Sequence, residues 1–163
     1  MNLRPLSLLA AVLLLAACSE TPSTSTTNSG AGTQATGPST SSTIAPGSKE
    51  DFIQNVGDRV FFAFDKSDIS SEARATLQKQ ADWLKRYPNV TVTVEGHCDE
   101  RGTREYNLAL GERRASSVKK VLIALGVQTS RVSTISYGKE RPAVLGSNET
   151  AWAQNRRGVT VIN

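Results

Sequence analysis

A change of composition near residue 49 limits where a folded core can form in this chain. Residues 19–48 consist almost wholly of Ser, Thr, Gly, Ala and Pro, with a single charged residue, Glu20, and a single bulky apolar residue, Ile44. Such a segment cannot bury enough apolar surface to offset the entropy lost on folding, so it is expected to be a disordered linker. A flexible coil of this length has a typical span of ~30 Å and a stretched reach of ~100 Å. The fold must therefore be built from residues 49–163.

The first 17 residues are typical of an export signal. Arg4 supplies a positive charge, and the apolar run over residues 6–17 is too short to span a bilayer. The tetrapeptide LAAC, which ends at Cys18, resembles the bacterial lipobox, in which the cysteine is lipidated before cleavage. This resemblance implies a lipid at Cys18 and, because Ser19 follows, sorting to the outer membrane, where two or more acyl chains anchor stably. The alternative is an ordinary secretory signal in which Cys18 falls by chance.

The cysteine count argues against a disulfide-stabilised domain, and the charge argues against a nucleic-acid-binding protein. If Cys18 carries lipid, Cys98 is the other cysteine of the chain and no intramolecular disulfide can form. The formal net charge is +4, and basic residues are interleaved with acidic ones rather than gathered into a stripe. We therefore expect no nucleic-acid partner.

Hydrophobic periodicity within residues 49–163 predicts strands that alternate with helices. Strands are expected at 60–64, 91–95, 132–136 and 159–162, and helices at about 71–87, 107–125 and 149–154. Ser70 or Ser71 is expected to cap the first helix, which must stop before Pro88. The resulting βαβαβ(α)β order favours an α/β (α+β) sandwich, with one small sheet and helices packed on one of its faces.

The stretch EGHCDERGTREYN, which begins at Glu95, places the single histidine beside a cysteine and two carboxylates. Because side chains alternate across a strand, His97 and Cys98 are expected to point to opposite faces, which makes them poor catalytic partners. Contiguous ligands also converge poorly on a metal ion. We therefore expect no catalytic and no metal site here, with Cys98 a small, partly buried residue at a strand end and His97 a polar residue at the edge of the sheet.

Arg114 lies near the centre of the apolar face of the second long helix, one turn from both Leu110 and Val118. A guanidinium does not lose its proton, so its burial without an acceptor is very costly and Arg114 is expected to need an anion. Two sources of that anion remain open. Asp99, at the end of the preceding strand, would make an internal pair, which composition favours, and a ligand carboxylate would make an external one.

Four segments, VFFAFDKSDI, TVEGHCDERGTREYNLALGERRASSV, ISYGKERPAV and NRRGV, resemble the peptidoglycan-binding signature of OmpA-like domains. With the lipobox and the linker, the chain is similar to the peptidoglycan-associated lipoproteins of the Tol–Pal system. The resemblance implies an OmpA-like fold with a small mixed sheet and no cofactor. It also implies a non-enzymatic outer-membrane lipoprotein with a periplasmic domain, which ties that membrane to the cell wall, maintains envelope integrity and supports constriction at division. TolB and TolA are its implied protein partners.

In that family the diaminopimelate residue of the peptidoglycan stem peptide is held as a zwitterion. Carried over by position, the resemblance implies that Asp99 receives its ammonium group and that Arg114 clamps its carboxylate through a two-pronged hydrogen bond. Asp65, Arg101 and Leu110 match further contact positions. Without the resemblance, Asp65 would simply end a strand, Arg101 would be a solvated loop charge and Leu110 would be ordinary core.

Two alternatives stay open at this point. The first is a periplasmic thiol-dependent cell-wall hydrolase with Cys98 as nucleophile, although the family usually has alanine at this position, which favours a packing role. The second is a structural tether or adhesin in which Asp99 and Arg114 simply pair with each other.

Overall fold

The computed structural model describes residues 44–163. The predicted signal peptide at residues 1–17, the predicted lipidation at Cys18 and most of the predicted linker therefore lie outside the described residues. The described part starts ahead of α1 (Lys49–Asp51), whose N-cap Ser48 accepts a hydrogen bond from the Asp51 backbone N–H. Within residues 44–163, no helix is both long enough and apolar enough to cross a membrane.

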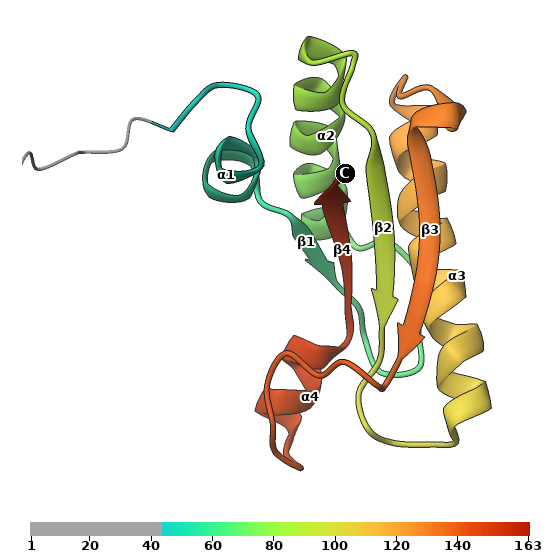
Figure 1. Ribbon diagram of the computed structural model, residues 1–163. Coiled ribbons are helices and arrows are strands. Elements are labelled where there is room, and N and C mark those ends of the chain that lie inside the picture. The colour runs from blue at the N-terminus through green and yellow to red at the C-terminus, as the bar shows by residue number, and fades with distance from the viewer. Residues whose placement is uncertain (1–43) are drawn as a thin grey trace, which may run out of the picture. The chain divides into compact units, whose positions relative to one another are not determined.

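The fold is a four-stranded mixed sheet with its two long helices on one face (Figure 1). The strands, in the sheet order β1-β4-β2-β3, are β1 (Arg59–Phe61), β4 (Arg157–Ile162), β2 (Val92–His97) and β3 (Val132–Gly138). β2 and β3 are parallel, whereas β4 runs antiparallel to both β1 and β2. The helical segments are α1, η1 (Phe52–Val56), α2 (Ser71–Arg86), α3 (Arg104–Ala124), η2 (Thr129–Arg131) and α4 (Glu149–Asn155). The predicted fold class is confirmed.

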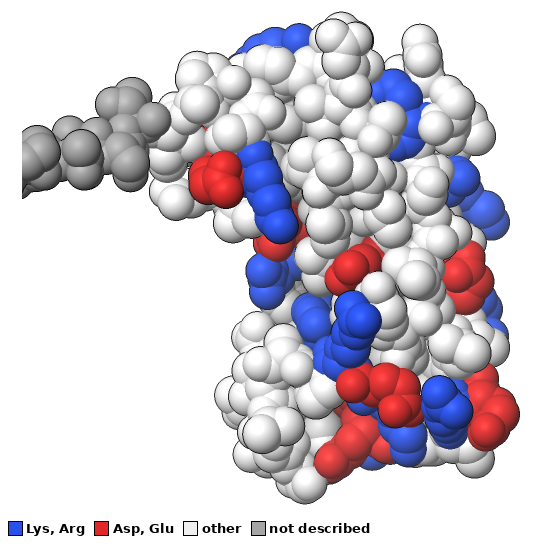
Figure 2. All heavy atoms as spheres, viewed as in Figure 1, with Lys and Arg blue, Asp and Glu red and all other residues white. Residues whose placement is uncertain are grey.

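The hydrophobic core lies between the sheet and the helices α2 and α3. Its fully buried members alternate along β2 and recur at helical spacing, as the periodicity predicted: Val92, Val94, Leu77, Leu84, Ala115, Val118 and Leu122. The opposite face of the sheet is turned toward the viewer in Figure 1. On that side, shown as spheres in Figure 2, the basic and acidic side chains of the described residues are intermixed.

Two caps account for where the long helices begin. Ser70 accepts a hydrogen bond from the Ala73 backbone N–H at 3.1 Å, so α2 starts where it was predicted. Thr103 caps α3 in the same way, accepting from the Tyr106 backbone N–H at 3.2 Å. The second helix therefore begins three residues before the predicted Asn107, because the cap lies in what periodicity alone assigned to a loop.

The first strand is shorter than predicted. It ends at Phe61, and the following residues leave the sheet and contact the first half of α3, at Tyr106 and Arg114. Asp65 in this turn has a φ of 57°, in the left-handed region that aspartate tolerates better than most residues. This turn, rather than a longer strand, brings the 63–66 backbone to the functional site.

Close approach of α3 to β2 fixes the position of the site. A Cβ atom at Gly96 would lie 1.8 Å from the Gly111 backbone oxygen, so the helix and the strand are in direct backbone contact there. Leu110 and Arg114 lie about one turn apart on the same face of α3. The contact at Gly111 places both of them beside the carboxyl end of β2.

Candidate functional site

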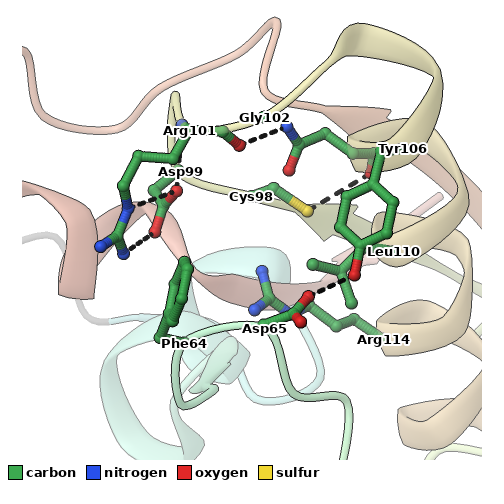
Figure 3. A pocket seen from close by; sticks show the side chains of 10 residues that line it. Phe64, Asp65, Cys98, Asp99, Arg101, Gly102, Tyr106, Leu110 and Arg114 are labelled. Atoms are coloured by element: carbon green, nitrogen blue, oxygen red, sulfur yellow. Dashed lines mark hydrogen bonds and ion pairs between the residues drawn. The ribbon is translucent and has the colours of Figure 1, made fainter.

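A pocket with a cavity volume of about 180 Å³ lies where the end of β2, the turn after β1 and the first turns of α3 meet (Figure 3). Its lining contains all five residues that the sequence predicted for ligand binding: Asp65, Asp99, Arg101, Leu110 and Arg114. The remaining lining residues are Phe64, Cys98, Gly102, Tyr106 and Asn107. Residues separated by up to 50 positions thus share one concave surface.

Asp99 is the buried carboxylate of the pocket, with 4% of its surface exposed. Its Oδ1 accepts from the Arg101 backbone N–H and from Arg101 Nε, both at 3.2 Å. Its Oδ2 accepts from Arg101 Nη2 at 2.6 Å and from Arg156 Nη1 at 3.4 Å. Burial opposes ionisation of Asp99, but the hydrogen bonds from Arg101 and Arg156 outweigh burial and hold its pKa below the usual value. Asp99 is therefore an anion at neutral pH.

Arg114 is fully buried, as its position on the helix predicted, but its acceptors are not those expected. Nε donates to the Lys66 carbonyl at 2.9 Å, Nη1 to the His97 carbonyl at 2.8 Å and Nη2 to the Ala63 carbonyl at 3.2 Å. The expectation that Arg114 needs an anion was therefore wrong. The turn after β1 and the end of β2 direct backbone carbonyls at the guanidinium, and these satisfy three of its five N–H donors without a carboxylate.

The internal Asp99–Arg114 pair is also absent: among residues 44–163, the ion pairs of Asp99 are with Arg101 and Arg156. Burial lowers the pKa of Arg114, yet from so high a starting value the group stays charged at neutral pH. Two of its five N–H groups are not engaged by these three carbonyls. The pocket thus carries one buried anion and one buried cation that are satisfied independently of each other.

Arg101 spans the side of the pocket next to α4. Its guanidinium carbon lies 3.9 Å from the ring centroid of Phe64 and 4.0 Å from that of Trp152, so the group is stacked between two aromatic faces. Arg156 reaches Asp99 from the end of α4 and also pairs with Glu149 at 2.6 Å. The Arg101 guanidinium is therefore in contact with aromatic side chains that are far from it in the chain.

Tyr106 and Asp65 close the mouth of the pocket. The Tyr106 hydroxyl donates to Asp65 Oδ1 at 2.5 Å, and this hydrogen bond raises the pKa of the phenol. Asn107 Nδ2 donates to the Arg101 carbonyl at 2.7 Å and to the Thr103 carbonyl at 3.0 Å, which fixes the loop between β2 and α3. Phe64, at 57% exposure, and Tyr106, at 47%, leave a half-exposed aromatic rim at the opening.

Several of these residues were not singled out by sequence reasoning. Phe64, Tyr106 and Arg156 lie inside the motifs that resemble OmpA-like domains, so the motifs contained them without assigning them a role. Trp152 lies outside those motifs, and only the predicted short helix at 149–154 gave any local signal for it.

The geometry of His97 and Cys98 argues against a thiol enzyme. Cys98 faces α3, with its Sγ donating to the Asn107 carbonyl at 3.3 Å, and burial raises the pKa of the thiol. His97 instead packs against Tyr137, with ring centroids 5.5 Å apart, and contacts Glu95 Oε2 at 3.3 Å. The two side chains thus have separate surroundings, and the thiol stays protonated.

His97 was wrongly expected at the edge of the sheet. β2 is an interior strand, between β4 and β3, so His97 is 2% exposed. Burial, followed by the charges of Arg157 and Arg141, lowers its pKa to about 4. Over residues 44–163, no group of three or more His, Cys, Asp and Glu side chains is arranged to hold a metal ion.

Comparison with known proteins gives a consistent family. Residues 61–156 match the family model of the OmpA family. A peptidoglycan-associated lipoprotein of Brucella melitensis is 58% identical over 118 residues, which cover 72% of this chain and 70% of the relative. One of Agrobacterium fabrum is 58% identical over 117 residues, covering 72% of this chain and 66% of the relative. The crystal structure of the peptidoglycan-associated lipoprotein from Burkholderia pseudomallei matches with a TM-score of 0.64 and 43% identity, covering 65% of this chain and 90% of that one.

Proposed function

The chain belongs to the OmpA family, and on that basis we propose that it is a non-enzymatic lipoprotein of the outer membrane that binds peptidoglycan noncovalently. The family match, the relatives' names and the similarity to a solved lipoprotein of this kind support the proposal. The observation that carries it is the pocket at the end of β2, which holds a buried carboxylate and a buried guanidinium that do not pair with each other. Two separate buried charges of opposite sign suit a zwitterion.

The proposed ligand is the free zwitterionic end of diaminopimelate in the stem peptide. Its ammonium group would be received by Asp99, and its carboxylate would be directed at the two N–H groups of Arg114 that the backbone carbonyls leave free. A ligand that lacks either charge would forgo one of these two charge-assisted contacts, so amides and simple acids are expected to bind more weakly.

The other predicted site residues would complete the binding surface. Leu110, at 5% exposure, contributes an apolar part of the pocket lining. Asp65 and Tyr106, joined across the mouth, would limit entry to a slender chain such as the side chain of a diamino acid. Arg101, already against Asp99, would adjust the charge that the ligand meets.

The proposed anchor, by contrast, depends on residues outside the described part of the chain. A lipid at Cys18 and a flexible linker would keep the domain near the cell wall, so that even modest affinity for a dense polymer holds the outer membrane to it. By family likeness, the protein would act in the Tol–Pal system with TolB and TolA, maintaining envelope integrity and supporting constriction at division.

Cosedimentation of the full chain with purified sacculi tests the binding function. The natural protein should pellet with sacculi and be released by free diaminopimelate, whereas Asp99→Asn should stay in solution. Asp82→Asn is the matched control, because Asp82 makes the same kind of ion pair, with Lys85 at 2.7 Å, but on the exposed surface of α2. The proposal would be overturned if the natural protein failed to pellet, or if diaminopimelate released neither the natural protein nor Asp82→Asn from the sacculi.

The hydrolase alternative is not favoured. A nucleophile needs an ionised, accessible thiol, but Cys98 is 3% exposed and burial raises its pKa. The tether in which Asp99 pairs with Arg114 is not favoured either, because Asp99 pairs with Arg101 and Arg156 instead.

A further inference from the structure

The hydrogen-bonding capacity of Asp99 is already filled within the protein. A carboxylate offers about four lone-pair sites on its two oxygens. Oδ1 accepts from the Arg101 backbone N–H and from Arg101 Nε, and Oδ2 accepts from Arg101 Nη2 and Arg156 Nη1. An incoming ammonium group therefore finds no free acceptor site unless one of these four donors leaves.

Of these donors, the Arg101 side chain is the least constrained. Arg156 is 8% exposed at its side chain and is also held by the Phe62 carbonyl at 3.1 Å and by Glu149 at 2.6 Å. The Arg101 backbone N–H cannot move away easily, because Asn107 Nδ2 donates to the Arg101 carbonyl and so holds this part of the loop. The Arg101 side chain, by contrast, is 30% exposed, and within residues 44–163 Asp99 is its only hydrogen-bond acceptor.

The surroundings of Arg101 also offer it a place to go. The guanidinium carbon lies over the rings of both Phe64 and Trp152, within 4.0 Å of each ring centroid, and Phe64 is half exposed at the mouth of the pocket. A guanidinium can slide outward between these rings, keeping part of its cation–π contact while its nitrogens become hydrated. Figure 3 shows Arg101 beside Asp99, with Phe64 on the pocket side.

We infer that Arg101 is a built-in counter-ion that occupies the ammonium position of the pocket, and that a ligand reaches Asp99 only by displacing it along the slot between Phe64 and Trp152. This inference rests on the proposed function. It makes Arg101 a determinant of affinity, because every ligand must compete with a tethered cation. It also couples ligand entry to the surroundings of Trp152 on α4.

Titration of the full chain with free diaminopimelic acid tests this role by calorimetry. Arg101→Gln shortens the side chain and removes its charge, so the charge-assisted hydrogen bonds to Asp99 are lost or replaced by a weaker neutral one, and the variant should bind about fivefold more tightly than the natural protein. Arg104→Gln is the matched control. Arg104 is three residues away with a side chain 75% exposed, and it pairs with Glu140 outside this pocket, so affinity should not change. Equal or weaker binding by Arg101→Gln would overturn the inference.

A second measurement uses the natural protein and does not depend on the stability of a variant. The indole N–H resonance of Trp152 should shift when diaminopimelic acid binds, while that of Trp83, which donates to Asp51 outside this pocket, should stay in place. Binding without a Trp152 shift would contradict displacement of Arg101 but leave the proposed function intact. Absence of any binding by the natural protein would refute the proposed function itself.

Discussion

The three carbonyls around Arg114 predict that this residue stabilises the fold as well as serving the pocket. Arg114→Met keeps much of the volume and apolar contact of the side chain but removes its donors. The His97 carbonyl would then be left buried without a partner, at a cost of about 1–3 kcal/mol. The Lys66 and Ala63 carbonyls are part-buried and can regain water, so each adds less. Removal of a desolvated charge offsets some of this cost.

We therefore expect Arg114→Met to lower the free energy of unfolding by about 3 kcal/mol, a large fraction of the stability of a domain of this size. Urea denaturation followed by tryptophan fluorescence measures the change, which should appear as a lower midpoint with an unchanged slope. Arg113→Met is the matched control, because Arg113 is exposed on the same helix. Equal stability of the two variants would refute the idea that the hydrogen bonds from Arg114 to these carbonyls stabilise the fold.

Three further predictions concern the core and the strand end. Because folding lowers the pKa of His97 to about 4, the unfolded chain binds more protons between pH ~6.5 and ~4, so stability should fall by about 2–3 kcal/mol across that range on acidification. Chemical denaturation at several pH values should find this loss absent in His97→Gln. Gly96→Ala would set a Cβ against the Gly111 backbone oxygen and should cost at least ~3 kcal/mol or prevent folding, seen as a lowered melting temperature. Cys98→Ala should pellet with sacculi like the natural protein and lose less than ~1.5 kcal/mol, and native Cys98 should resist a thiol reagent that labels the unfolded chain, whereas rapid labelling would revive the hydrolase.

The elements of this fold were largely predictable because their signals are local. Alternation over residues 91–95 predicted β2, and Ser70 before an apolar stripe predicted the start of α2. The position of Arg114 on the apolar face of its helix predicted its burial. Where local signals were weak, the predicted boundaries were wrong. The predicted end of β1 was too late, and the predicted start of α3 was too late because Thr103 caps the helix.

The sequence by itself determined which residues form helices and strands, which faces are buried and that Arg114 is a buried cation. Only the tertiary structure decided what surrounds that cation and which charges pair. Side-chain periodicity is a property of neighbouring residues, whereas the acceptors of Arg114 are backbone carbonyls 17 to 51 residues away. Every residue carries such a carbonyl, so no residue type marks it in advance. The path of the backbone alone turns the Ala63, Lys66 and His97 carbonyls toward Arg114 and leaves Asp99 to Arg101 and Arg156.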